Sequence, residues 1–354
     1  MAIDGPSTPE VDALLARLNP PQREAVTHGE GPLLIFAGAG SGKTRVLTAR
    51  IAYLIETHRV WPDRLLAVTF TNKAAKEMRA RVENLVAERA QGALLNQVSA
   101  EKMWVGTFHS TAVKILRREA PRIGITNSFV IFDEDDTRAA LRRVLDELRL
   151  DPKRYPLGAL SNAISQAKNE LKGPAEYPNR SYADEVVRRV YESYQEVLRR
   201  SGGLDFDDLI MKLVELFNTD AEALEKWRDR FRHVLVDEYQ DTNRAQYVLV
   251  NQLALEHRNL VVVGDDDQSI YRFRGADIRN ILDFRKDYPD AHIVRLEQNY
   301  RSSQAILDAA YAVIRSNPER AEKRLWTERA GGEKVMAMQA YNEVEEAEFV
   351  ADEI

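Results

Sequence analysis

The residues best suited to chemistry lie in one short stretch of small side chains that ends in a lysine and a threonine. It reads Ala37-Gly38-Ala39-Gly40-Ser41-Gly42-Lys43-Thr44, follows an apolar run and precedes a segment with helical spacing. Glycines let a backbone wrap closely enough for its N–H groups to face phosphate oxygens, and the start of a helix adds unpaired donors and partial positive charge. Lys43 would reach the outer phosphates of a nucleotide, and the Thr44 hydroxyl would bind Mg²⁺. The strict pattern has glycine at Ala37, but alanine is small enough to keep the loop tight.

Two adjacent carboxylates form the second candidate group. Asp237 and Glu238 directly follow the apolar residues 234–236, which predict a buried strand. Side chains alternate along a strand, and the alternation changes where the chain leaves it, so the two neighbours can take different roles. Asp237 is placed to hold Mg²⁺ through water, and Glu238 to orient the attacking water and accept its proton. Combined with the lysine-bearing loop, the pair predicts hydrolysis of a nucleoside triphosphate.

A third group alternates aromatic and basic side chains. Gln268 follows three acidic residues and precedes Tyr271-Arg272-Phe273-Arg274. Aromatic faces stack on nucleic-acid bases at roughly 1–3 kcal/mol each. The segment therefore suits a loop that joins phosphates on one side to bases on the other, although both rings could instead pack beneath the loop.

Two further polar residues lie near predicted helix starts. Gln22 follows Asn19 and two prolines, which predict a helix N-terminus, and its amide could both donate to and accept from an adenine edge. An exposed glutamine without such a role is the commoner case. Arg301 follows the predicted strand 293–296 at a helix start, where its guanidinium could stabilise the charge of a γ-phosphate.

Strands and helices alternate in most of the chain, which predicts an α/β fold with a doubly wound parallel sheet. Ligands of such sheets lie beyond the carboxyl ends of the strands. Phe70 ends the predicted strand 65–70 and Thr71 and Asn72 follow it, so all three lie at that edge, although Phe70 could equally belong to the core. A loop is expected over residues 106–110. Its His109 has no second His or Cys at ligand spacing, so it is a structural histidine or a contact to base or phosphate.

Composition narrows the class of protein. The 354 residues include no cysteine, which excludes disulfides and thiolate chemistry. No apolar run approaches the roughly 20 residues that cross a bilayer, so we expect a cytoplasmic protein without membrane contact. The net charge of −6 argues mildly against a nucleic-acid binder that works by overall attraction. Residues 101–200 are the exception, with 18 Lys and Arg against 15 Asp and Glu.

Taken together, these stretches resemble the superfamily-one DNA helicases of the UvrD/PcrA/Rep type. The resemblance runs from about Leu18 to the end of the chain and depends on ordered blocks. These are Leu18–Gln22, Ala37–Thr44, Thr69–Ala75, Thr107–Ser110, Asp205–Leu209 with Val234–Asn243, Val261–Asp277 and Leu296–Ser303. The resemblance implies an ATP-dependent, 3′→5′ helicase or translocase that acts on junctions of single-stranded and duplex DNA. A role in DNA repair, with repair or loading proteins as possible partners, is implied in the same way.

The resemblance also implies residue roles. Gln22 selects adenine, the loop from Ala37 to Thr44 and the following Arg45 bind ATP, and Thr44 and Asp237 hold Mg²⁺. Lys43, Glu238, Gln268 and Arg301 form the catalytic set, with Gln268 sensing the γ-phosphate and Arg301 acting as an arginine finger. The expected DNA contacts are Phe70, Thr71, Asn72, Thr107, His109, Tyr271 and Phe273. Phe273 stands where the family more often has tryptophan, so it offers a smaller stacking face.

The domain division expected from the sequence has four parts. Residues 1–8 form a flexible tail, 9–90 and 203–288 a first RecA-like ATP-binding domain, and 91–202 an inserted helical domain. Residues 289–354 begin a second RecA-like domain, with a strand over 334–339 and an acidic helix over 343–354. Because the family's second domain extends well past the position of Ile354, we expect this chain to be an N-terminal portion.

Two alternatives to the helicase remain open and one fails. A nucleotide-switch module would bind ATP and a protein partner but would not need aromatics beside a phosphate sensor. A helicase–nuclease subunit would carry its nuclease beyond residue 354. A small GTPase would need Asn-Lys-x-Asp to read guanine, but Asn72-Lys73 is followed by two alanines.

Overall fold

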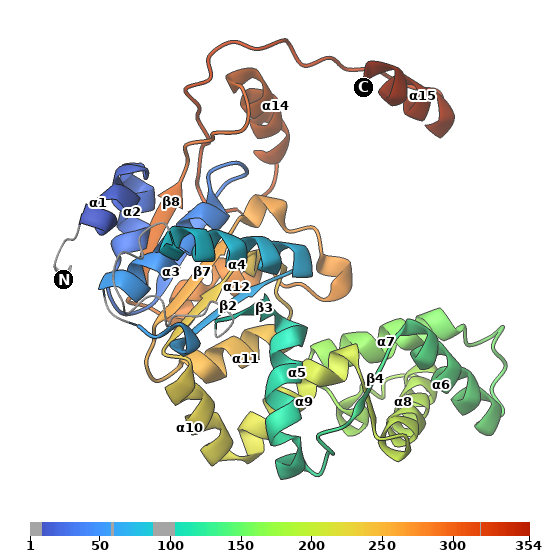
Figure 1. Ribbon diagram of the computed structural model, residues 1–354. Helices are drawn as coiled ribbons and strands as arrows, with labels where there is room; N and C mark the ends of the chain where they lie inside the picture. Colours follow the sequence, from blue (N-terminus) through green and yellow to red (C-terminus); the bar gives the residue numbers. More distant parts are fainter. Residues whose placement is uncertain (1–8, 58–59, 88–102, 319) are drawn as a thin grey trace.

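The computed structural model describes residues 9–57, 60–87, 103–318 and 320–354. Its centre is a six-stranded sheet in the order β3-β2-β6-β7-β1-β8, in which all paired strands run parallel (Figure 1). The strands are β1 (Leu33–Ala37), β2 (Leu65–Thr69), β3 (Trp104–Thr107), β6 (His233–Val236), β7 (Leu260–Gly264) and β8 (His292–Leu296). The α/β class and the parallel sheet are therefore confirmed.

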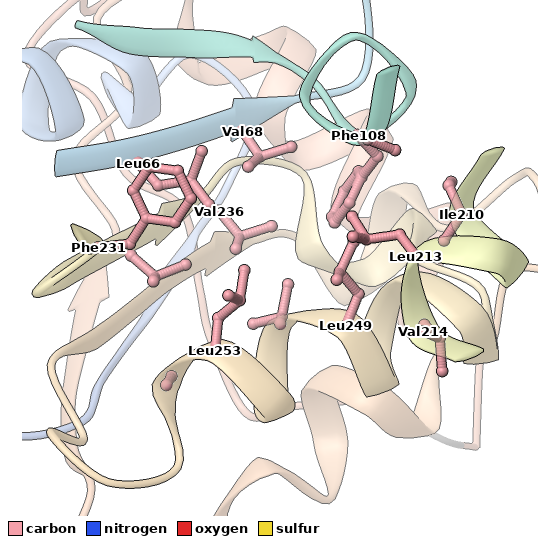
Figure 2. Close-up of a cluster of buried hydrophobic side chains, with 14 of the residues drawn as sticks. Leu66, Val68, Phe108, Ile210, Leu213, Val214, Phe231, Val236, Leu249 and Leu253 are labelled. Carbon is pink, nitrogen blue, oxygen red and sulfur yellow. The ribbon is translucent and has the colours of Figure 1, made fainter. Parts of the chain in front are cut away.

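Both faces of the sheet are covered, as a doubly wound arrangement requires. Along β1, Leu33 and Ile35 enter one buried cluster, while Leu34 and Phe36 enter the other. Figure 2 shows part of the second cluster, in which strand residues such as Val236 face leucines of the covering helices. The first face is covered by α1 (Pro9–Ala16), α2 (Pro20–Thr27), α3 (Lys43–Thr57) and α4 (Asn72–Ala87). The second is covered by α5 (Phe108–Glu119), α9 (Phe206–Thr219), α10 (Ala221–Arg230), α11 (Arg244–Ala254), α12 (Arg279–Leu282) and α13 (Phe284–Asp287).

A group of helices with its own core extends from this α/β unit (Figure 1). Its members are α6 (Glu134–Glu147), α7 (Leu157–Asn169) and α8 (Tyr182–Arg200). Two short parallel strands that the sequence did not indicate, β4 (Val130–Phe132) and β5 (Gly203–Asp205), pair where the chain enters and leaves the group. Lys168 is fully buried between Asp205 and Asp208, at 2.6 and 2.8 Å. These acids therefore have a structural partner and need no catalytic role.

Two local predictions were wrong. Residues 106–110 are not a loop, because β3 runs through Thr107 and α5 begins at Phe108. The Thr107 hydroxyl accepts from the Ser110 amide at 3.2 Å, and the Ser110 hydroxyl accepts from the Thr107 amide at 2.9 Å, so a capping box joins strand to helix directly. The apolar stretch 334–339 forms no strand, and its Val335 and Met336 are exposed. An apolar run alone does not make a strand without a neighbouring strand to pair with its backbone hydrogen-bonding groups.

The last part of the chain rises from the sheet (Figure 1). It contains α14 (Gln304–Ile314) and α15 (Glu343–Glu353), which confirms the acidic helix. β8 pairs with β1 in the central sheet, although the expected domain boundary at residue 289 lies before it. The expected tail 1–8 and residues 91–102, the start of the expected insertion, lie outside the described residues. Within the described ranges, no helix combines the length and apolar character needed to span a bilayer.

Candidate nucleotide site and adjoining groove

The glycine loop turns directly from β1 into α3. Ala37 is the last residue of β1 and Lys43 the first of α3, so the intervening backbone amides surround the start of a helix. Gly40 has a φ of +68°, and a Cβ there would lie 2.7 Å from Asn299 Nδ2 and 2.8 Å from Arg301 Cβ. Conformation and crowding both require glycine at this position. The loop is further fixed by Ser41, whose buried hydroxyl donates to the Gly38 carbonyl at 2.7 Å.

The carboxylate pair lies against this loop. The Asp237 amide donates to the Val68 carbonyl of β2 at 2.9 Å, which places the pair at the carboxyl edge of the sheet. Glu238 Oε2 is 3.4 Å from Lys43 Nζ. The Glu238 backbone has a φ of +51°, a left-handed conformation that costs a non-glycine residue free energy and is concentrated at functional sites. The structure thus brings together the two groups on which triphosphate chemistry depends.

The surroundings of Asp237 suit a cation. Burial and, secondly, the charge of Glu238 raise the pKa of Asp237 to about 7. The described residues contain no cluster of three or more His, Cys, Asp or Glu side chains that could hold a metal alone. Mg²⁺ beside a nucleotide needs only one or two protein oxygens, because phosphates and waters complete its shell. The Asp237 carboxylate and the half-buried Thr44 hydroxyl supply such oxygens.

Gln240 is a site residue that sequence reasoning missed. Its amide nitrogen donates to Glu238 Oε2 at 3.0 Å and to Asp241 Oδ2 at 3.1 Å, while its oxygen accepts from the Asp265 amide at 3.0 Å. It therefore joins the end of β6 to the end of β7. A Cβ at Gly264 would lie 2.5 Å from the same oxygen, so the close approach depends on that glycine. The available signal was an amide side chain between acids at a strand end.

The Gln22 side chain packs against the phosphate loop. It is buried, donates to the Ser41 carbonyl at 2.9 Å and accepts from the Asn19 amide at 3.3 Å. One amide hydrogen and one oxygen lone pair remain for a ligand. Arg45 is exposed, and its guanidinium donates to the Arg17 carbonyl.

Arg301 lies over the same loop. Asn299 holds this segment, since its side chain donates to the Ala39 carbonyl at 2.6 Å and accepts from the Arg301 amide at 2.8 Å. The Arg301 side chain is exposed. The predicted helix start was misplaced, because α14 begins only at Gln304. Gln268 lies at the end of β7, where its side chain donates to Asp265.

Beside the nucleotide site, the same edge of the sheet carries a groove of about 1120 Å³. Three rings follow one another along it: Phe70 stacks on Tyr271 with centroids 5.4 Å apart, and Tyr271 lies 6.0 Å from Phe273. Phe273 is 79% exposed. Six of the expected DNA contacts line the groove, and Asn72 does not; the six are Phe70, Thr71, Thr107, His109, Tyr271 and Phe273.

A ring that sequence reasoning missed lies against His109, one of the residues that line the groove. Phe206 is 53% exposed at the start of α9 and meets His109 edge-on, with centroids 6.1 Å apart. The available signal was an aromatic side chain between two acidic residues at a helix start, a position where the core does not need an apolar side chain. Burial lowers the pKa of His109, so the imidazole is neutral near pH 7 and offers a hydrogen bond rather than a charge.

Comparison with known proteins agrees with this geometry. Residues 18–289 match the model of the UvrD/REP helicase N-terminal domain, and residues 294–354 match that of the UvrD-like helicase C-terminal domain. Proteins named ATP-dependent DNA helicase PcrA from Staphylococcus epidermidis and Staphylococcus aureus are each 51% identical over 346 residues. That alignment covers 97% of this chain and 46% of each relative, so the chain spans about half the length of the curated relatives it matches. The chain belongs to the UvrD/REP helicase family.

Proposed function

We propose that this chain binds ATP with Mg²⁺ between the phosphate loop and the β6 carboxylates, and one DNA strand in the adjoining groove. In this proposal it acts within an ATP-dependent DNA helicase, the activity named for its relatives. The observation that carries the proposal is the 3.4 Å contact of Lys43 with Glu238 at the sheet edge that also presents the stacked rings of the groove. A pure nucleotide switch would have no use for those rings.

The residue roles in this proposal are those implied by the family resemblance, and the positions described support them. The loop amides and Lys43 bind phosphates, Thr44 and Asp237 hold Mg²⁺, and Gln22 reads adenine with its remaining amide hydrogen and lone pair. Bound Mg²⁺ would neutralise phosphate charge. Glu238 orients and deprotonates the attacking water, and Arg301 stabilises charge on the γ-phosphate. Gln268 would report the state of that phosphate to the rings that follow it.

The wider setting is part of the proposal. The inserted helical domain expected from the sequence is supported by the separate core of the helices α6 to α8, although β3 and α5, within its expected bounds, belong to the central α/β unit. Movement in the 3′→5′ direction, action at junctions of single-stranded and duplex DNA, and a repair role with repair or loading proteins are proposed from family membership. A cytoplasmic location is proposed from the same membership.

The test of the proposed function is ATP hydrolysis with and without single-stranded DNA. We expect DNA to raise the rate, because ATP site and groove share the loops at one sheet edge. Lys43→Ala should abolish hydrolysis and so exclude a contaminating enzyme. A rate that does not respond to DNA would favour the nucleotide switch over the helicase.

The most exposed ring of the groove gives a second prediction. Phe273→Ala should weaken binding of a single-stranded oligonucleotide by about 1–3 kcal/mol, the usual range for one stacked base. Fluorescence anisotropy with a labelled oligonucleotide measures the change. Trp61→Ala is the matched control, because Trp61 is 58% exposed but precedes the amino end of β2, at the opposite sheet edge. Equal affinities for both variants would show that bases do not stack on Phe273.

A further inference from the structure

A buried lysine forms ion pairs with three consecutive carboxylates that follow β7. Lys323 Nζ lies 2.8 Å from Asp265 Oδ1 and 3.0 Å from Asp267 Oδ2, and it also pairs with Asp266. The lysine side chain is only 4% exposed. Arg320 adds a second cation, with its Nε and Nη2 at 3.0 and 2.8 Å from the two oxygens of Asp267.

These contacts join two segments far apart in sequence. The acids form the start of the loop that leads to Gln268, whereas Lys323 belongs to the segment that follows α14. The Ala321 amide also donates to Asp266 Oδ2, at 2.6 Å. The Arg320 guanidinium lies 5.7 Å from the ring centroid of Tyr311, so the same segment is attached to α14 itself. Ion pairs and a hydrogen bond therefore connect the loop after β7 to the segment that follows α14.

Asp265 is the residue through which this attachment reaches both proposed ligands. Its amide donates to Gln240, which in turn donates to Glu238 beside Lys43. Its carboxylate accepts from Gln268. Tyr271, which stacks on Phe70 in the groove, follows three residues after Gln268.

We propose that Lys323 is a positioning residue for coupling between nucleotide and DNA: by holding Asp265, Asp266 and Asp267 around one ammonium, it fixes Gln268 and links it to α14. The inference rests on the proposed function. Three neighbouring carboxylates in a buried site repel one another unless a cation compensates them. Without Lys323 the acids would separate or take up protons, and Asp265 would no longer hold Gln240 and Gln268 in one arrangement.

The test measures how one ligand changes the affinity for the other, without hydrolysis. The dissociation constant of a labelled single-stranded oligonucleotide is measured with and without Mg²⁺ and a non-hydrolysable ATP analogue. The ratio of the two constants should be at least about 5-fold for the unaltered chain, the lower range for coupled sites. Lys323→Met should bring the ratio below about 2-fold while leaving the affinity for DNA alone little changed. Lys323→Arg keeps the charge and should retain most of the ratio.

A matched control separates positioning from stability. Lys226→Met also removes a lysine from a buried carboxylate, Glu119 at 2.6 Å, but on α10; its ratio should equal that of the unaltered chain. If Lys323→Met does not fold, Arg320→Met replaces it as the test variant. It removes one cation from Asp267, and its ratio should lie between about 2-fold and that of the unaltered chain. If the test variant, Lys323→Met or in its place Arg320→Met, has the same ratio as the unaltered chain, the inference is overturned.

The unaltered chain distinguishes this inference from the proposed function. If it binds both ligands but neither changes the affinity for the other, the role of Lys323 is wrong and the two binding sites stand. If it binds neither ligand, the proposed function is wrong and the inference fails with it.

Discussion

Glu238→Gln is expected to lower the turnover number for ATP by about 10²–10⁴-fold, the usual contribution of a general base. Glutamine keeps the length of the side chain and an oxygen that can accept from Lys43, which lies 3.4 Å from the carboxylate in the structure. It cannot accept a proton from water. ATP affinity should therefore change little while hydrolysis nearly stops. Steady-state phosphate release gives the rate, and fluorescence of a labelled ATP analogue gives the affinity.

Glu256→Gln provides the control for this substitution. Glu256 is 69% exposed and pairs with Arg228 at 3.2 Å, remote from the phosphate loop, so its loss should leave both constants unchanged. A Glu238→Gln variant with turnover within about tenfold of the unaltered chain would assign the base to another residue. Asp241 would then be the next candidate, since it shares the Gln240 amide with Glu238 and burial raises its pKa to about 6.

The parts of the site that were predictable have their chemistry in contiguous residues. A phosphate loop needs glycines, a lysine and a helix start within one turn of chain, so the pattern from Ala37 to Thr44 identified it and Gly40 has the expected left-handed backbone. The acidic pair after β6 was predictable for the same reason, because an apolar run must end where it reaches the sheet edge. Placement of Phe70 and Tyr271 at one sheet edge needed only their positions after strands β2 and β7, whereas their stacking on each other was not predicted, because β6 lies between the two strands.

What sequence reasoning missed depends on partners distant in the chain. Nothing near Lys323 shows that it pairs with Asp266, and nothing near Lys168 shows that Asp205 and Asp208 enclose it. β4 and β5 have three residues each, too few for alternation to be recognised, and they form because their chain segments meet. The failed strand at 334–339 is the reverse case, an apolar pattern that finds no pairing partner in the structure.

Arg301→Ala is expected to lower DNA-stimulated ATP turnover by about 10³–10⁵-fold, the effect of removing an arginine finger. The structure gives the reason for expecting this role of Arg301. Asn299 fixes the Arg301 backbone through its amide, and the Arg301 Cβ lies 2.8 Å from where a Cβ of Gly40 would be. The Arg301 side chain is therefore attached to the backbone next to the phosphate loop. From there its guanidinium can reach the charge that develops on the γ-phosphate.

Two further variants decide whether charge alone explains the effect. Arg301→Lys keeps a positive charge but loses the planar fork that grips two phosphate oxygens, so its turnover should lie between those of the unaltered chain and Arg301→Ala. Arg315→Ala removes an exposed arginine at the end of α14 and should leave turnover unchanged. If Arg301→Ala behaves like Arg315→Ala, Arg301 does not stabilise the transition state, and its place above Gly40 serves only to cover the loop. A loss confined to ATP affinity would instead assign Arg301 to binding of the ground state, because a finger acts on the turnover number.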